Sequence, residues 1–121
     1  LEDAYRFRTP MLRNVALTAP YGHNGAFPDL ESVIRHHLDP QASLDKWTPQ
    51  MAALAQVPWL QETDFLVWQD HYEMERQRKK IDIDPIQLAE LEIENLIAFL
   101  HSLTGRSVDS PIFDVPKGFT P

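Results

Sequence analysis

Apolar side chains recur at helical spacing in several stretches of the chain, and no segment alternates convincingly with a period of two. One helix is predicted from Asp29, which can act as its N-cap, to Leu38, and Pro40 should end it. His36 lies about 100° from His37 around this helix and nearer its polar side. Because the apolar spacing is helical throughout, the predicted fold class is all-α. The apolar stripe of the helix comprises Leu30, Val33, Ile34, His37 and Leu38.

The clearest pattern predicts a closing helix that begins at Asp84 and runs to about Leu103. Pro85 suits its first turn, and Gln87 completes a pair that resembles a capping box. Gly105 is expected at the position just after the helix. Because apolar residues cover much of its circumference, we expect this helix to be central to the core. These residues are Leu88, Leu91, Leu96, Phe99, Leu100 and Leu103.

Prolines divide the remainder of the chain. Residues 5–24 read as an extended or turn-rich loop, and the tail at 106–121 reads as coil. Thr48 and Pro49 predict a short helix to about Ala55. A further helix is predicted from Thr63 to Lys80. One face of it would carry Phe65, Trp68 and Tyr72.

Composition narrows the possible chemistry. The net charge of −7 argues against a non-specific nucleic-acid surface. No apolar run is long enough for a membrane span. The absence of cysteine excludes disulfides, thiolate metal sites and a C-x-x-C-H haem attachment motif within these residues. Nucleophile-elbow, P-loop, Rossmann and H-E-x-x-H motifs are also absent from the sequence.

His37 is the histidine with the clearest candidate chemistry. Burial of an imidazole on an apolar stripe costs free energy unless both ring nitrogens have partners. A metal could occupy one nitrogen and a hydrogen-bond acceptor the other. The alternative is an ordinary hydrogen-bonded core histidine. A zinc site is a weaker hypothesis, because adjacent His36 and His37 point apart and no cysteine is available.

Three segments resemble one known family. Residues 7–25, FRTPMLRNVALTAPYGHNG, closely resemble a signature of the C-terminal haem domain of bacterial di-haem cytochrome c peroxidases and MauG-like enzymes. Residues 30–34, LESVI, are similar to the family's next element. Residues 97–105, IAFLHSLTG, are similar to its closing helix. The length and order of these matches make the resemblance specific.

The resemblance implies a cytochrome c-like helical domain with long loops, the C-terminal portion of a two-domain protein. In such proteins each domain carries covalent haem c, and calcium lies between the haems. Residues 1–39 would form the signature loop and ligand helix. Residues 40–83 would be an insertion, residues 84–105 the closing helix and residues 106–121 a coil tail.

The resemblance also assigns an iron ligand. Counting without gaps from His23, the distal ligand position of the electron-relay haem falls on His37, with His36 as the fallback. That ligand is methionine in typical peroxidases and tyrosine in MauG-like enzymes. Main-chain oxygens of Thr18 and Pro20 correspond to calcium contacts of the family.

Other family positions lie near the haem. Arg8 and Arg13 match arginines that could pair with haem propionates, although they could equally be loop-bracing arginines. His23 is expected to brace its turn rather than to bind iron. Gly22 departs from the family, in which a bulky residue is common. The insertion adds aromatic residues that could carry electrons but are more often core: Trp47, Trp59, Trp68 and Tyr72.

The function that the resemblance implies is reduction of hydrogen peroxide in the periplasm, with electrons from a small redox donor such as a cytochrome c. The catalytic residues are then expected in an N-terminal haem-bearing part of the protein or in a companion chain. The alternatives are a MauG-like oxidase, which modifies a partner protein through high-valent haem iron, and a non-catalytic haem electron-transfer module. A homodimer is compatible with each of these.

Overall fold

The computed structural model describes residues 3–55, 57–60 and 63–105, so the predicted coil tail lies outside the described residues. In this part of the chain the regular elements are all helical, with one isolated bridge between Tyr21 and Phe27, and the predicted all-α class is confirmed. The α-helices are α1 (Leu30–Leu38), α2 (Pro40–Lys46), α3 (Leu66–Gln69), α4 (His71–Arg78) and α5 (Glu90–Ser102). Short 3-10 turns cover Val15–Leu17, His23–Gly25 and Pro49–Met51.

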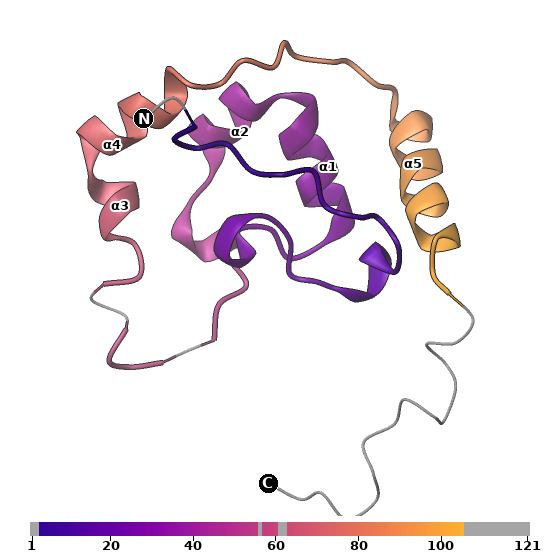
Figure 1. Cartoon of the computed structure of the whole chain (residues 1–121), viewed down its shortest axis with the longest axis horizontal. Helices are drawn as coiled ribbons and strands as arrows, with labels where there is room; N and C mark the ends of the chain where they lie inside the picture. Colours follow the sequence, from indigo (N-terminus) through magenta and orange to yellow (C-terminus); the bar gives the residue numbers. More distant parts are fainter. Residues whose placement is uncertain (1–2, 56, 61–62, 106–121) are drawn as a thin grey trace, which may run out of the picture.

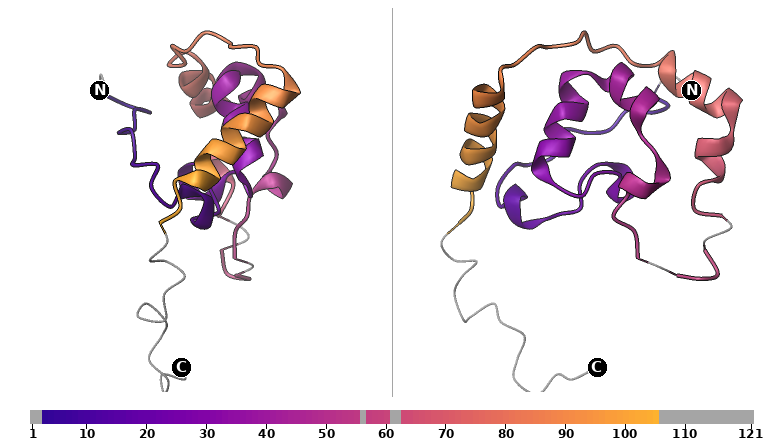
Figure 2. Two further views of the ribbon diagram at one scale, coloured as in Figure 1. Left: turned by 90° about the vertical axis from the view of Figure 1, so that its right-hand side faces the viewer. Right: turned by 180° about the vertical axis from the view of Figure 1, so that it is seen from behind.

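Helices α1 and α2 lie in the middle of the molecule, between α5 on one side and α3 with α4 on the other (Figure 1). An extended linker, residues 79–89, joins α4 to α5, and the view from behind shows the same order of elements (Figure 2). The N-terminal segment begins beside α4 and reaches the C-terminal end of α5. Among the described helices, none is long and apolar enough to cross a membrane.

A small apolar core forms where the start of α1 packs against the turn that precedes it. Its buried members are Tyr21, Phe27 and Leu30, and partly buried side chains surround them. Two polar groups of aromatic residues are satisfied at its edge, because Trp47 Nε1 donates to the Ala26 carbonyl oxygen at 2.9 Å and the Tyr21 hydroxyl donates to a nearby carbonyl. The partly buried residues are Val15, Ala16, Ala26, Val33, Trp47 and Leu100.

Helix α1 forms where the sequence pattern predicted a helix. Asp29 has extended backbone angles, and its side chain accepts a hydrogen bond from the Ser32 amide at 2.8 Å, which caps α1. Pro40 does not simply stop the helical path, because it is the first residue of α2, a helix that the sequence pattern did not predict. Asp39 caps α2 by accepting from the Ala42 amide at 2.9 Å. An aspartate before proline therefore starts a new helix here.

Two other predicted helices are wrong in extent. Residues 48–55 contain only the turn Pro49–Met51, and Thr48 makes no capping hydrogen bond with its side chain. The predicted helix at 63–80 is divided into α3 and α4 by Asp70, whose ψ of 104° is not helical. The Asp70 carboxylate instead caps α4 by accepting from the main-chain amides of Tyr72 and Glu73. Phe65, Trp68 and Tyr72 therefore do not share the face of one helix.

The closing helix is shorter and less buried than predicted. It starts at Glu90, and the Glu92 carboxylate accepts from the Ala89 amide at 2.7 Å, so the signals at 84–87 lie in the linker. Thr104, and not Gly105, directly follows the C-cap residue Leu103. The expectation that α5 is central to the core is wrong for the described residues, because Ile93 is its one buried residue. Leu91 is 65% exposed and Phe99 is 53% exposed.

Gly22 is required by its surroundings. Its φ of 74° with ψ of −177° is a conformation that is almost restricted to glycine. A Cβ atom at this position would lie 2.8 Å from Cδ2 of Phe27. Close packing of the turn against a core aromatic ring therefore explains this departure from the family pattern.

We expect Gly22→Ala to lower the free energy of unfolding by about 1–3 kcal/mol, through strained backbone and contact with the Phe27 ring. Chemical denaturation of the purified protein would measure this change. Glu94→Ala, at an exposed position of α5, is the control and should have little effect. Equal stability of the two variants would contradict the explanation.

Candidate haem-ligand site

The burial of the two histidines of α1 is the reverse of what its periodicity predicts. His37 is exposed, whereas His36 is partly buried and packs against Phe27 with ring centroids 4.8 Å apart. Nδ1 of His36 lies 2.9 Å from Ser43 Oγ on α2. The prediction that His37 lies on the buried stripe is therefore wrong. The reason is α2, which folds back over the side of α1 that carries His36.

One nitrogen of the His37 ring is engaged within its own helix. Its Nδ1 lies 2.8 Å from the Val33 carbonyl oxygen. Since a carbonyl oxygen can only accept, Nδ1 must carry the hydrogen in this contact. In the neutral ring Nε2 then keeps its lone pair, on a side chain that is exposed. A histidine whose Nδ1–H is bound to a main-chain oxygen and whose Nε2 is unprotonated has the arrangement of many metal-ligating imidazoles.

His36 has a different environment. Burial, and secondly the neighbouring His37, lower the pKa of His36 below its usual value. Its ring is held between Phe27 and Ser43, so it connects α1 to the core and to α2. This packing gives His36 a structural role in the described part of the chain.

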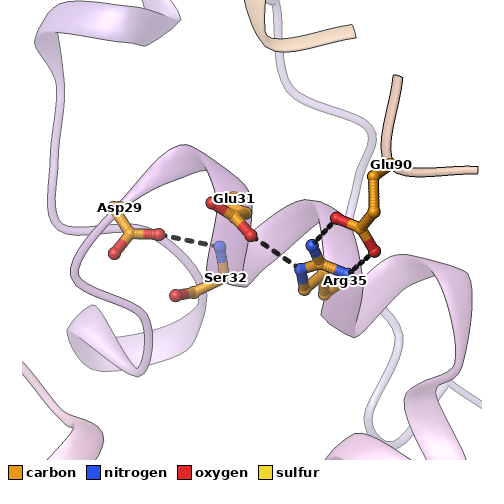
Figure 3. Close-up of polar contacts among 5 residues, drawn as sticks. All are labelled: Asp29, Glu31, Ser32, Arg35 and Glu90. Atoms are coloured by element: carbon orange, nitrogen blue, oxygen red, sulfur yellow. Dashed lines mark hydrogen bonds and ion pairs between the residues drawn. The ribbon is translucent and has the colours of Figure 1, made fainter. Parts of the chain in front are cut away.

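Arg35, next to the two histidines, forms the most extensive polar contact of α1 (Figure 3). Its Nε donates to Glu31 Oε1 at 2.8 Å, and its two terminal nitrogens bind the two oxygens of Glu90 at 3.3 and 2.5 Å. The hydrogen bonds that Arg35 donates to Glu90, and secondly the one that it donates to Glu31, raise the pKa of Arg35. The guanidinium likewise lowers the pKa of Glu90. This pair connects α1 to the start of α5.

The other predicted haem contacts lie on the signature loop. Arg8 and Arg13 are exposed, and neither forms an ion pair with a described residue. His23 is also exposed, and its ring lies against that of Phe7 with centroids 5.1 Å apart. These side chains are therefore available to groups that the described residues do not supply.

The predicted calcium contacts, Thr18 and Pro20, lie in an exposed part of the same loop. The Thr18 hydroxyl donates to the Val15 carbonyl oxygen at 2.9 Å. Neither the Thr18 nor the Pro20 carbonyl accepts a hydrogen bond from a described residue. The described residues also contain no group of three or more histidine, aspartate or glutamate side chains that could hold a metal ion. Calcium binding here stays a prediction that needs further oxygen donors.

Two contacts that we did not predict fix the signature loop. Asn14 has left-handed backbone angles, its amide donates to the Leu103 carbonyl oxygen at 3.2 Å, and its Oδ1 accepts from the Gly105 amide at 2.7 Å. The Tyr5 hydroxyl donates to Glu73 on α4. The tolerance of asparagine for left-handed angles was a local signal for the first contact, whereas no sequence signal pointed to the second.

Large apolar side chains are exposed at both ends of the described structure. On the signature loop and α5 they are Phe7, Met11, Leu12, Leu17, Leu91, Leu96 and Phe99. Among the aromatic residues of the segment 40–83, the interpretation as core fits Trp47 alone of the four, since Trp59 is 80% exposed, Tyr72 is 86% exposed and Trp68 is also exposed. Exposed apolar surface often marks an interface where such residues adjoin one another.

Comparison with known proteins identifies relatives. The chain is 32% identical over 107 residues to the methylamine utilization protein MauG of Paracoccus denitrificans, a match that covers 84% of this chain and 23% of MauG. It is 30% identical over 121 residues to the cytochrome c551 peroxidase of Pseudomonas aeruginosa, covering 98% of this chain and 23% of the peroxidase. A third match, 52% identical over 33 residues, is to the cytochrome-c peroxidase IdrP1 of a Pseudomonas species, covering 27% of this chain and 9% of that protein.

No protein-family model matches the chain, and no solved structure matches it. The chain spans about a quarter of the length of the first two relatives. Both matches extend over most of the chain and are not confined to the signature loop. The chain therefore belongs to the MauG/di-haem peroxidase-like family.

Proposed function

We propose that this chain is the C-terminal part of a di-haem c-type peroxidase, in which His37 supplies the distal axial ligand of the electron-relay haem. The observation that carries the proposal is the His37 ring, whose Nδ1 lies 2.8 Å from the Val33 carbonyl oxygen and whose side chain is exposed. Because His37 is exposed, the apolar stripe no longer supports its assignment, and the proposal rests on the family position and on this contact. An exposed ring could be reached by a haem that is held by residues outside this chain. His36, which packs on Phe27, is less suited to reach an iron atom.

The residues of this chain fit one side of a haem. Without cysteine, they cannot supply the covalent attachment or the C-x-x-C-H histidine, which must come from elsewhere in the protein. When bound, the haem supplies one-electron transfer. His37 would hold the iron, and Arg8 and Arg13, which have no ion pair with described residues, would bind the propionates. Carbonyl oxygens of Thr18 and Pro20 would contribute to a calcium site.

The uncovered apolar surface supports a larger assembly. Phe7, Met11 and Phe99 are exposed in the described structure, as are several of their neighbours. We propose that an N-terminal haem-bearing part, of the same protein or of a companion chain, covers this surface. The length of the relatives, of which the chain spans about a quarter, leaves room for such a part.

The reaction that we propose for the whole protein is reduction of hydrogen peroxide to water in the periplasm, with electrons from a small donor such as a cytochrome c. Support comes from two relatives that are named as cytochrome c peroxidases. In this scheme His37 would hold the relay iron, and that haem would supply electron transfer rather than peroxide binding. The residues that bind and cleave peroxide would lie in the N-terminal part.

A MauG-like oxidase is the second candidate. The match to MauG is 32% identical, and position 37 is not methionine. In that case the haems would oxidise residues of a partner protein. The exposed aromatic residues of the insertion, Trp59 and Tyr72, could then be part of the electron path.

Peroxide turnover by the full-length protein tests the first candidate. After reductive activation, we expect oxidation of reduced cytochrome c to depend on added hydrogen peroxide, followed as loss of the reduced donor's absorbance. A heat-denatured sample is the control. Absence of turnover with several small donors, together with peroxide-dependent oxidation of a partner protein, would favour the MauG-like alternative instead.

A further inference from the structure

The turn of α1 that carries His37 is held on both sides by the segment that leads into α5. Before His37, Arg35 binds Glu90 through two hydrogen bonds. After His37, the Leu38 carbonyl oxygen accepts from the Ile86 amide at 2.8 Å. The last turn of α1 is therefore joined to α5 through Glu90 and to the preceding linker through Ile86.

The contact of Arg35 with Glu90 also fixes the relative orientation of the two side chains. A guanidinium that binds both oxygens of one carboxylate has a defined plane, unlike a lysine ammonium. Glu31, one turn earlier on α1, occupies the remaining Nε–H of Arg35 and restricts its side chain further. Figure 3 shows the guanidinium between Glu31 and Glu90, with the Glu90 carboxylate reaching it from the other segment.

Helix orientation sets the orientation of the imidazole. The His37 ring is bound to the Val33 carbonyl oxygen of its own helix, so it moves with α1. A rotation of the last turn would carry Nε2 with it. An iron–imidazole bond is directional, so such a rotation would weaken coordination.

We propose that Arg35 and Glu90 are positioning residues for His37, and that their ion pair holds the ligand helix in the orientation that coordinates the haem iron. This inference rests on the proposed function. In this proposal Arg35 and Glu90 touch neither iron nor substrate, because Glu90 binds Arg35 and Arg35 binds both Glu90 and Glu31. They act through the angle between α1 and α5.

Carbon monoxide binding to the reduced full-length holoprotein tests the inference, because the gas can bind the relay iron only after His37 leaves. The relevant kinetic phase is the one that becomes fast in His37→Ala. In Glu90→Gln we expect this phase to be about two- to fivefold faster than in the wild type, the range of an exposed ion pair. Glu90→Lys, which places a like charge beside Arg35, should accelerate it further.

Asp82→Asn is the matched control, because it removes the Arg6–Asp82 ion pair at 3.0 Å, which is also exposed but does not touch α1. Thermal unfolding of each variant reports any general loss of stability. Rates equal to wild type in both Glu90 variants would overturn the positioning role while leaving ligation by His37 intact. An unchanged haem spectrum in His37→Ala would instead overturn the proposed function itself.

Discussion

Replacing His37 by alanine in the full-length protein is expected to change the relay haem from six-coordinate low-spin to high-spin, with loss of the low-spin signal in absorption and electron paramagnetic resonance spectra. The physical reason is that Nδ1 is engaged with the Val33 carbonyl oxygen at 2.8 Å, so Nε2 is the ring nitrogen left to bind the iron. Alanine removes the donor atom and leaves the iron open on that side. The opened site should then bind cyanide, which can be titrated.

His36→Ala is the matched control for this experiment. It removes an imidazole from the adjacent position, where the ring packs against Phe27 and contacts Ser43. We expect this variant to keep the low-spin spectrum and to lose some stability, because the removed contacts are structural. Loss of the low-spin signal in His36→Ala, with an unchanged spectrum in His37→Ala, would show that His36 is the ligand.

His37→Met extends the test to the electronics of the haem. A methionine thioether could restore six-coordination, and axial-ligand identity is a main determinant of haem potential. We expect the reduction potential of the relay haem to be higher in this variant than in the wild type, as measured by spectroelectrochemical titration. A potential equal to or below the wild-type value would contradict a histidine–iron bond at this position.

Local sequence signals predict a helix correctly where the residue that caps it fits only one role at that position. Asp29 is such a case, since its carboxylate caps α1 as its position suggested. Pro40 is the opposite case, because proline fits the end of one helix and the start of the next equally well. The Asp39 carboxylate, which accepts from the Ala42 amide, shows that Pro40 starts a helix as well as ending one. This hydrogen bond forms only because the chain turns into α2 directly after α1.

The orientation of α1 could not be derived from its own residues. Periodicity finds an apolar stripe, but the edge of a buried face depends on which neighbour covers it. Here α2 covers the side of His36 and supplies Ser43 as a partner. Because the sequence pattern does not predict α2, it does not contain the contact that decides which of His36 and His37 is buried.

The apolar character of α5 was recognised, but its burial was not predicted correctly. Ile93 is buried, whereas Leu91 and Phe99 face away from the described residues. Under the proposed function, their partner is a part of the protein that this chain does not contain. The candidate residues on the signature loop came from family resemblance, because nothing in their local spacing distinguishes Arg8 or Thr18 from ordinary loop residues.

Phe27→Ala is expected to lower the free energy of unfolding by about 3–4 kcal/mol, the largest stability effect of a single substitution that we predict here. Phe27 is 6% exposed and belongs to the core with Tyr21 and Leu30. Its ring also supports His36, so α1 should lose its packing as well. Denaturant unfolding would measure the loss, and Tyr72→Ala, at an exposed aromatic residue, should change stability by far less.

A double-mutant cycle separates the two reasons why Gly22 is required. The Cβ of Gly22→Ala would lie 2.8 Å from the Phe27 ring, so the contact exists only while the ring is present. In the Phe27→Ala background, Gly22→Ala should therefore lower the free energy of unfolding by less than it does alone. The destabilisation that remains is then due to backbone strain at the positive φ. Additive effects of the two substitutions would mean that backbone strain alone requires glycine at this turn, and that the ring can shift to admit a methyl group.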